Sequence, residues 1–425
     1  MATLAAVLLL VLGGAVLRFW PVPAVQRQAL AALQAPAPVQ GPDGSALLWS
    51  LGYDGADEAG RERLLAGAVA RWEQQPPGSR DGVFAVGPPL VHLAMPAGSR
   101  CASRGEGCLA QVRADPGRFA AAHQGHEALH ARVARLADHG AFLQPFSTGP
   151  GDVTTALPEL LPLLDPPAAH ALAFVHGDTP AALQGACQGI LAGRRLVHGS
   201  DMLVVSMVGA AMVETNAHLL AEMLVELPAA LALPAACQAA LQPMAVDEQD
   251  ICPAMRGEFA QVSAALDVPG VQLRWGWPVF DGPRTRLRRA PYYAWACGAP
   301  ARRALAEDQP LPVPAAPRRG LACLANAQGC TLADMGSAAL QPYAARSQDA
   351  AAMLRLVATQ RWLRQQPGAP AQALAALPAA LRSSTRVPVV SADGQRLEVA
   401  RRSPAVLDRA GPVLSVPLVP ASGPR

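Results

Sequence analysis

The stretch DMLVVSMVGAAMVETNAHLLAEMLVEL, residues 201–227, decides the fold class because it has the length and composition of a long core helix. Its first half, Met202 to Val213, is apolar on every side, as expected of a helix that is buried all round. Glu214, Asn216 and His218 follow at once, and such polar groups are costly inside a membrane. We therefore predict a buried helix of a folded domain over residues 201–227, not a membrane span.

Helical patterns continue on both sides of this stretch. Ala and Leu dominate the composition and are strong helix formers, while 41 prolines exclude any single very long helix. The first helix is expected to take Asp54 as its N-cap and to end before Pro76. No fixed repeat period accompanies the helices, so the sequence predicts a mainly α fold, either an irregular multi-helix bundle or a helical array. Besides residues 201–227, helices are predicted over residues 56–75, 116–139, 168–176, 180–196, 234–241, 253–266, 348–366 and 370–381.

The basic residues exclude several kinds of chemistry. All 35 are arginine, because the chain contains no lysine. A phosphate-binding loop with its lysine, a Schiff base and a Ser-x-x-Lys acyl enzyme are therefore impossible. The net charge of +3 is small for 425 residues and the arginines are scattered, so no nucleic-acid partner is expected.

The first residues carry the signal for membrane attachment. Ala2 to Leu17 contains no charge, and Phe19 and Trp20 extend the segment to nearly the ~20 residues that a bilayer requires. We expect residues 1–22 to be a single N-terminal membrane anchor, with a cleaved signal segment as the alternative. Residues 23–50 are rich in Pro, Gln and Ala and are expected to form an extended tether.

Beyond the tether, the chain is expected to divide into four parts. A helical domain over 51–300 is followed by a Pro-rich linker over 301–320 and a helical segment over 321–383. Residues 384–425 form a small β element, since two β-type runs flank the turn residues Ala392-Asp393-Gly394-Gln395. A third strand is expected near residues 413–418.

The eight cysteines indicate an oxidising compartment. Cys101 and Cys108 close the segment CASRGEGC, and Cys323 and Cys330 close CLANAQGC, so both are expected to form local disulfides. A third pair, Cys237 with Cys252, is expected between two helices. Cys187 and Cys297 remain, either paired over a long distance or free and buried. Structural zinc would require ligands separated by two to four residues, so disulfides are favoured over metal.

One motif has catalytic chemistry in it. His126-Glu127-Ala128-Leu129-His130 matches H-E-x-x-H, in which both histidines can hold one zinc ion and the glutamate can act as a general base. A zinc-dependent peptidase that uses His126, Glu127 and His130 is therefore an alternative function, with zinc as its cofactor. The third ligand is not specified by the sequence; Glu159 and Glu214 are two possibilities. The competing interpretation is a His-rich, partly exposed helix with no metal.

The aromatic residues gather between Trp275 and Trp295, beside the arginine-rich run 284–289. They can fill an irregular core, or they can form the surface of a small-molecule or glycan-binding domain. This binding domain is a second alternative function. Exposure of the Trp275 and Trp277 rings would separate it from the core interpretation.

Three segments carry a resemblance to other proteins: SLGYDGADEAGRERLLAGAVARW, CASRGEGCLAQVRADPGRF and ICPAMRGEFAQV. In them the chain resembles a group of predicted envelope proteins from high-GC proteobacteria. No activity, ligand or catalytic residue comes with that resemblance, which implies only the compartment and a helical fold. We therefore expect a non-enzymatic envelope protein with no cofactor. It would be held in the inner membrane by a single pass, with its bulk in the periplasm facing a protein partner; after cleavage it would be periplasmic or secreted.

Overall fold

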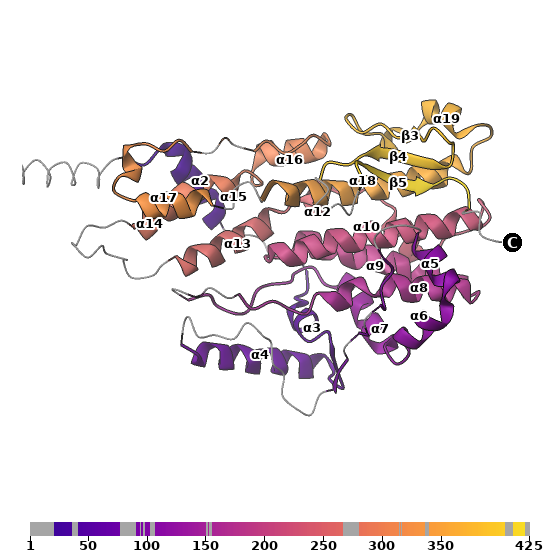
Figure 1. Ribbon diagram of the computed structural model, residues 1–425, viewed down its shortest axis with the longest axis horizontal. Helices are drawn as coiled ribbons and strands as arrows, with labels where there is room; N and C mark the ends of the chain where they lie inside the picture. Colours follow the sequence, from indigo (N-terminus) through magenta and orange to yellow (C-terminus); the bar gives the residue numbers. More distant parts are fainter. Residues whose placement is uncertain are drawn as a thin grey trace, which may run out of the picture.

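The computed structural model describes residues 21–35, 41–76, 91–93, 95–96, 98–102, 107–149, 152, 155–266, 280–313, 315, 317–335, 340–403 and 411–420. Within these ranges the chain is mainly helical and ends in a small antiparallel sheet, as the sequence predicts (Figure 1). The apolar segment on which the predicted anchor depends falls in residues 1–20, outside the described ranges.

The centre of the fold is a pair of long helices, α9 (Thr179–Gly199) and α10 (Leu203–Glu226). They follow one another directly and pack along much of their lengths. By length and composition α10 could cross a membrane, but 67% of its most apolar window is buried inside the protein. The helix thus lies in the protein core, and the prediction for residues 201–227 is confirmed.

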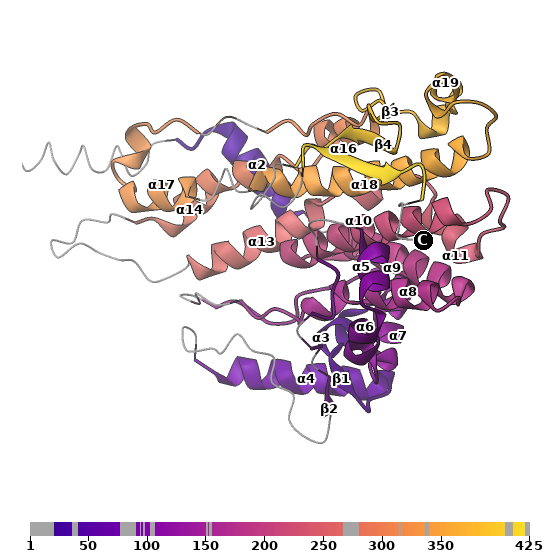
Figure 2. The same ribbon diagram turned by 45° about the vertical axis from the view of Figure 1, so that its right-hand side comes forward.

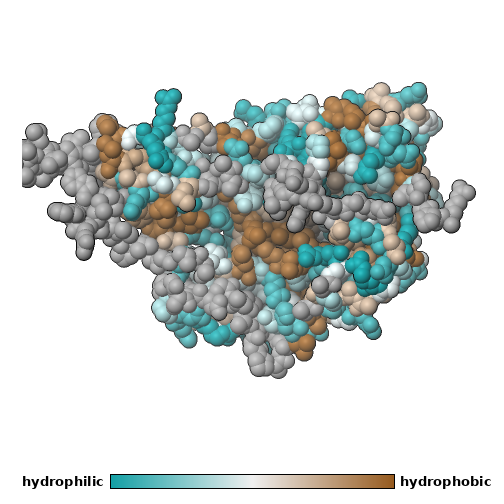
Figure 3. Space-filling view, in the orientation of Figure 1, coloured by the Kyte–Doolittle hydropathy of each residue, from teal (hydrophilic) through white to brown (hydrophobic). Residues whose placement is uncertain are grey.

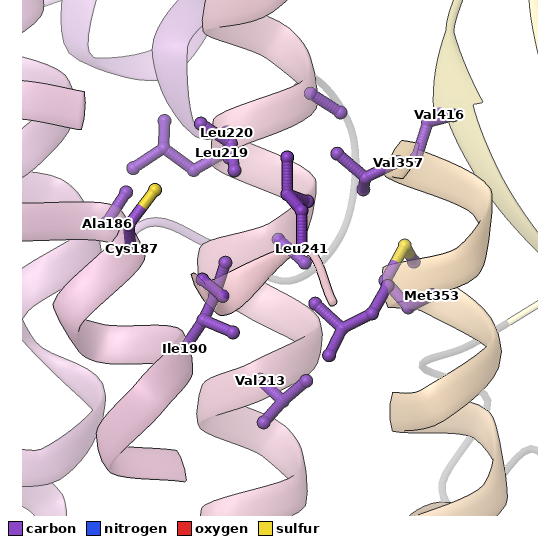
Figure 4. Packing of buried hydrophobic residues seen from close by; sticks show 14 of the residues in the cluster. Ala186, Cys187, Ile190, Val213, Leu219, Leu220, Leu241, Met353, Val357 and Val416 are labelled. Carbon is purple, nitrogen blue, oxygen red and sulfur yellow. The ribbon is translucent and has the colours of Figure 1, made fainter. Parts of the chain in front are cut away.

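The largest hydrophobic core lies between this pair, α18 (Gln341–Leu363) and the C-terminal sheet. Side chains from all of these elements meet there, so the predicted helical segment 321–383 and the β element 384–425 share a core with the predicted helical domain 51–300. Arg364, which directly follows α18, donates hydrogen bonds to the carbonyl oxygens of Leu224 and Leu227 at the C-terminal end of α10, where carbonyls have few helical partners. Figure 4 shows this packing through Ala186, Cys187, Ile190, Val213, Leu219, Leu220, Leu241, Met353, Val357 and Val416.

Shorter helices cover the other faces of the central pair. A second core forms around Trp49 and Phe142, beside η2 and the N-terminal half of α10. On the N-terminal side the elements are α3 (Ser45–Trp49), α4 (Glu58–Gln74), α5 (Cys108–Ala114), α6 (Pro116–His123), α7 (Glu127–Arg135), η1 (Leu136–Asp138), η2 (Leu161–Leu164), α8 (Pro166–Val175) and the paired strands β1 (Tyr53–Asp54) and β2 (Val91–His92).

The remaining helices follow α10 in the chain. They are α11 (Ala235–Ala240), α12 (Val246–Gln249), α13 (Cys252–Ala265), α14 (Gly282–Arg289), α15 (Pro291–Ala294), α16 (Ala299–Ala306), η3 (Leu321–Cys323), α17 (Ala327–Asp334), α19 (Pro370–Ala373), η5 (Leu374–Ala376) and η6 (Ala379–Leu381). Two views place α2 (Ala24–Gln34), α14 and α17 at one end of the molecule and α19 with the strand β3 (Val389–Val390) at the other (Figures 1 and 2).

The C-terminal sheet has the strands β3 (Val389–Val390), β4 (Arg396–Ala400) and β5 (Val413–Pro417). They are antiparallel in the order β3-β4-β5, so the predicted hairpin and third strand are confirmed. Gly394 takes a φ of 73° in the turn, a left-handed conformation that glycine adopts without steric cost. Leu397 and Val399 alternate with polar neighbours and face the core.

The predicted tether is wrong in part. Residues Ala24–Gln34, expected to be extended, form the helix α2, which packs against α13, α14 and α15. Leu33 is buried in a third core there, with Leu30 partly buried beside it. The two leucines lie three residues apart on one helical face, and this small apolar face outweighs the Pro and Gln composition. The predicted linker is corrected in the same way, because residues 301–306 belong to α16.

The boundaries of two predicted helices also differ. Asp57, not Asp54, caps α4: its carboxylate accepts a hydrogen bond from the Gly60 N–H at 2.7 Å. The helix predicted over residues 116–139 is two helices, α6 and α7, with a break between them. Gly125 has a φ of 80° in that break, a conformation that ends the first helix.

The structure pairs all eight cysteines. Cys101 is joined to Cys108 and Cys323 to Cys330, as their spacing predicts. The predicted pair Cys237–Cys252 is wrong. Cys237 is joined to Cys187, and Cys252 to Cys297. The physical reason is packing: α11 lies against α9, which brings Cys237 to Cys187, and α13 lies against α15, which brings Cys252 to Cys297 in the turn after α15.

Candidate functional site

The H-E-x-x-H motif lies across the start of α7. His126 is the N-cap residue, with φ −106° and ψ 10°, and its Nδ1 lies 3.1 Å from the Gln124 carbonyl oxygen. Glu127 is the first helical residue, and its exposed carboxylate accepts a hydrogen bond from the Gly125 N–H. Backbone hydrogen bonds lower the pKa of Glu127, which makes it a weaker base. Because His126 is only the cap, His130 is the one motif histidine that lies within α7.

His130 instead contacts a histidine outside the motif. Its Nε2 lies 3.3 Å from Nδ1 of His123 on α6, and the Nε2 of His123 lies 2.9 Å from the carbonyl oxygen of Ser99. A carbonyl accepts only, so His123 carries its proton on Nε2 and accepts from His130 through Nδ1. Burial lowers the pKa of His123, and it lowers the pKa of His130 to about 4. Both imidazoles are neutral at pH 7.

Two further titratable groups complete this histidine cluster, which we define as His123, His130, His170 and Asp165. Burial lowers the pKa of His170 on α8 to about 3, with smaller contributions from the charges of the two other histidines. Burial raises the pKa of Asp165, which accepts a hydrogen bond from the Ser99 hydroxyl at 2.9 Å. His170 packs against α9, where a Cβ on Gly185 would lie 2.3 Å from its Nδ1. The cluster is thus fixed between α6, α7, α8 and α9.

The two carboxylates considered as a third zinc ligand have other partners in the structure. Within the described ranges, no three His, Cys, Asp or Glu side chains converge as metal ligands. Glu159, one possible third ligand, lies 2.7 Å from His92, and Glu214, the other, is ion-paired with Arg401 at 2.5 Å. Both carboxylates are held by other partners. The zinc peptidase therefore stays a hypothesis, which metal analysis of the purified chain tests.

The histidine cluster predicts acid sensitivity. The folded pKa of His130 is about 4 against about 6.5 when unfolded, so the unfolded chain binds more protons between these values. The contribution of His130 to the free energy of unfolding is therefore fully present above pH 6.5 and is lost as the pH decreases toward 4. We expect the His130→Gln variant to lose about 1–3 kcal/mol less unfolding free energy than the unmodified chain between pH 6.5 and 4. Urea unfolding at several pH values measures the difference.

The pH dependence of stability has to be compared between variants, because other titratable groups change stability in the opposite direction as the pH falls. Burial raises the pKa of Asp201 to about 6, so its contribution to stability decreases as the pH rises from about 4 to 6. His176→Gln is the matched control, since His176 is exposed. Equal pH slopes in His130→Gln and the unmodified chain would contradict a role of the cluster in acid sensitivity.

The described aromatic residues of the predicted binding region lie in the core. Tyr292, Tyr293 and Trp295 are each at most 9% exposed, and the Trp295 indole N–H donates to the Tyr292 carbonyl at 2.7 Å. Trp275 and Trp277, on which the glycan-binding alternative depends, lie outside the described residues. These three rings pack internally.

A buried network of charges is a feature that the sequence analysis missed. Asp308 and Asp349 are 4% and 0% exposed, and Arg386 donates hydrogen bonds to both, at 2.6 Å and 2.8 Å. Arg355 and Arg402 also reach Asp308, at 2.5 Å and 2.8 Å. Burial raises the pKa of Asp308, but the arginine hydrogen bonds and charges outweigh it and hold the pKa below its ordinary value. We call these five residues the charge network.

The charge network connects elements far apart in the sequence. Asp308 follows α16, Asp349 and Arg355 belong to α18, and the other two arginines flank β3 and β4. A small pocket beside Arg355 and Arg386 has a volume of about 10 Å³, about enough for one water molecule. It is too small for an organic ligand. The network therefore joins the sheet to the helices and does not form a ligand site.

Comparisons with known proteins add no function. No protein-family model, no curated protein and no solved structure matches this chain. The resemblance to predicted envelope proteins stays an expectation from the sequence.

Proposed function

We propose that this chain is a non-enzymatic protein of the cell envelope that folds outside the cytosol and presents surfaces to a protein partner. One observation carries the proposal: all eight cysteines lie in four pairs. Disulfides persist in oxidising compartments and are rare in the cytosol. Two of the pairs, Cys187–Cys237 and Cys252–Cys297, join parts of the fold 50 and 45 positions apart, so the proposed compartment would matter for the packing of the helices as well as for the small loops.

The apolar segment from Ala2 to Leu17 supports attachment to a membrane. It is followed, after a few residues, by α2, whose leucines pack on the folded domain. A chain held by this segment would therefore connect to its domain through a packed helix. This arrangement favours an anchored protein over a freely tethered one.

The contacts of the buried charged residues support a role as a rigid scaffold. Arg194 on α9 is 7% exposed; it pairs with Glu248 at 2.6 Å and donates to carbonyl oxygens of residues 239, 240 and 242. Arg364 completes the end of α10, and the charge network joins the sheet to α18. These groups stabilise contacts between elements, which is what a rigid interaction domain requires.

The compartment is tested on the full chain with its thiols. We expect alkylation under denaturing, non-reducing conditions to label no cysteine of natively isolated protein, and all eight only after reduction. A phosphatase fused after residue 420, active only outside the cytosol, should be active, and deletion of residues 2–17 should abolish this activity. Free thiols in the native material, or a full-length phosphatase fusion that is made but inactive, would overturn the proposal.

A further inference from the structure

An exposed apolar surface marks one end of the molecule. It consists of four large side chains on and around η3 and α17: Leu321, Leu324, Leu332 and Met335 are 52%, 63%, 37% and 60% exposed. Figure 3 shows hydrophobic surface at this end, where α14 and α17 lie in Figure 1. Large apolar side chains gathered in one short segment mark a site of contact with a partner or a membrane. We call these four residues the apolar edge.

The apolar edge is held rigidly. The disulfide Cys323–Cys330 ties η3 to α17, and α17 packs on α14 so closely that a Cβ on Gly329 would lie 2.0 Å from the Thr285 hydroxyl oxygen. Asp334, at the end of α17, accepts hydrogen bonds from Arg288 at 2.9 Å and from the Tyr292 hydroxyl at 3.0 Å. The exposed side chains are thus presented by an ordered frame, as a binding surface requires.

Positive charge is concentrated around the apolar edge. Residues 24–34, 281–289 and 317–335 contain seven arginines and two aspartates, whereas the whole chain has a net charge of only +3. Arg318 and Arg319 directly precede the edge and are exposed, as is Arg27 on α2. Apolar side chains beside arginines are typical of surfaces that bind anionic lipid headgroups.

The position of α2 indicates what covers the apolar edge. The predicted membrane segment enters the domain through α2, which packs against α14, and α14 in turn packs against α17. The end that carries the apolar edge is therefore the end nearest the bilayer. We infer that the apolar edge and its surrounding arginines dock onto an anionic phospholipid bilayer, in the same membrane that holds residues 2–17. This inference rests on the anchor in the proposed function.

The test uses the full chain reconstituted in vesicles that contain a photoactivatable phospholipid, followed by digestion and mass spectrometry. We expect labels in residues 2–17 and also in residues 317–335. Adding phosphatidylglycerol to phosphatidylcholine vesicles should raise labelling of 317–335 at least about threefold, because the arginines attract anionic headgroups. Labelling of residues 2–17 should not depend on lipid charge.

Paired variants make the result specific. Leu324→Glu with Met335→Glu should abolish labelling of 317–335 and leave residues 2–17 labelled, and both positions are exposed, so folding should be kept. Val387→Glu with Val389→Glu is the matched control: these valines are 68% and 53% exposed at the opposite end and should not change the labelling.

Each contrary outcome has a distinct meaning. Labels in residues 2–17 without labels in 317–335 would overturn the docking and leave the anchor intact. Absence of both would overturn the anchor and the docking together. Crosslinks between two copies through 317–335 would identify a second chain, not lipid, as the occupant and would also overturn the inference.

Discussion

Asp308→Asn is expected to destabilise the protein by about 3–5 kcal/mol, because it removes one charge from a buried network and leaves its arginines without compensation. Arg355, Arg386 and Arg402 all donate to this carboxylate, and Asp349 alone would then face three guanidinium groups. Chemical unfolding followed by far-ultraviolet circular dichroism measures the change. We expect the sheet to lose its protection from hydrogen exchange before the α9–α10 pair does.

Asparagine is chosen because of the backbone at this position. Asp308 has a φ of 48°, a left-handed conformation that Asn adopts more readily than most residues. The substitution thus keeps shape and backbone, removes the charge and replaces one acceptor oxygen with an NH2 group that cannot accept from the arginines. Glu58→Gln is the control: it breaks the exposed Arg135–Glu58 pair, 51% and 70% exposed, and should cost at most about 1 kcal/mol. Equal, small losses in both variants would show that the network contributes no more than a surface ion pair.

The sequence predicted the parts of this fold that depend on local patterns. The apolar run of residues 201–227 predicted α10, and the turn at residues 392–395 predicted the hairpin of β3 and β4, because both signals are contained in short stretches of sequence. Two cysteines separated by seven positions predicted each small loop. The break before α7 was missed, although Gly125 gave a signal for it. The helix predicted over residues 116–139 ran through this glycine, whereas in the structure Gly125 takes a positive φ.

The predictions that failed concern contacts between residues that lie far apart in the sequence. Cys187 pairs with Cys237 across two helices, and no feature of either segment indicates the other. The charge network joins Asp308, Asp349 and Arg386, which are common residue types with no spacing rule. Since all basic residues are arginine, a buried one cannot be distinguished by type from the exposed majority. Tertiary packing alone selects these partners.

The close approach of α9 and α10 gives the second large expected effect. Gly193→Ala should destabilise the protein by about 1–3 kcal/mol or more, because the two helices would have to separate around a new methyl group. Its Cβ would lie 2.7 Å from the Gly209 carbonyl oxygen and 3.0 Å from the Val213 backbone nitrogen. These are backbone atoms that cannot rotate away. Thermal and urea unfolding of the purified variant measure the loss.

The same substitution elsewhere should have the opposite sign. Gly117 lies in α6, where a Cβ would meet no atom within 4 Å. Gly117→Ala should stabilise the protein by about 0.5–1 kcal/mol, since alanine loses less backbone entropy than glycine in a helix. The contrast between the two variants separates packing at the helix crossing from helix propensity. If Gly193→Ala were neutral or stabilising, α9 and α10 could not cross as closely as the structure places them, and the core built on that crossing would have to be arranged differently.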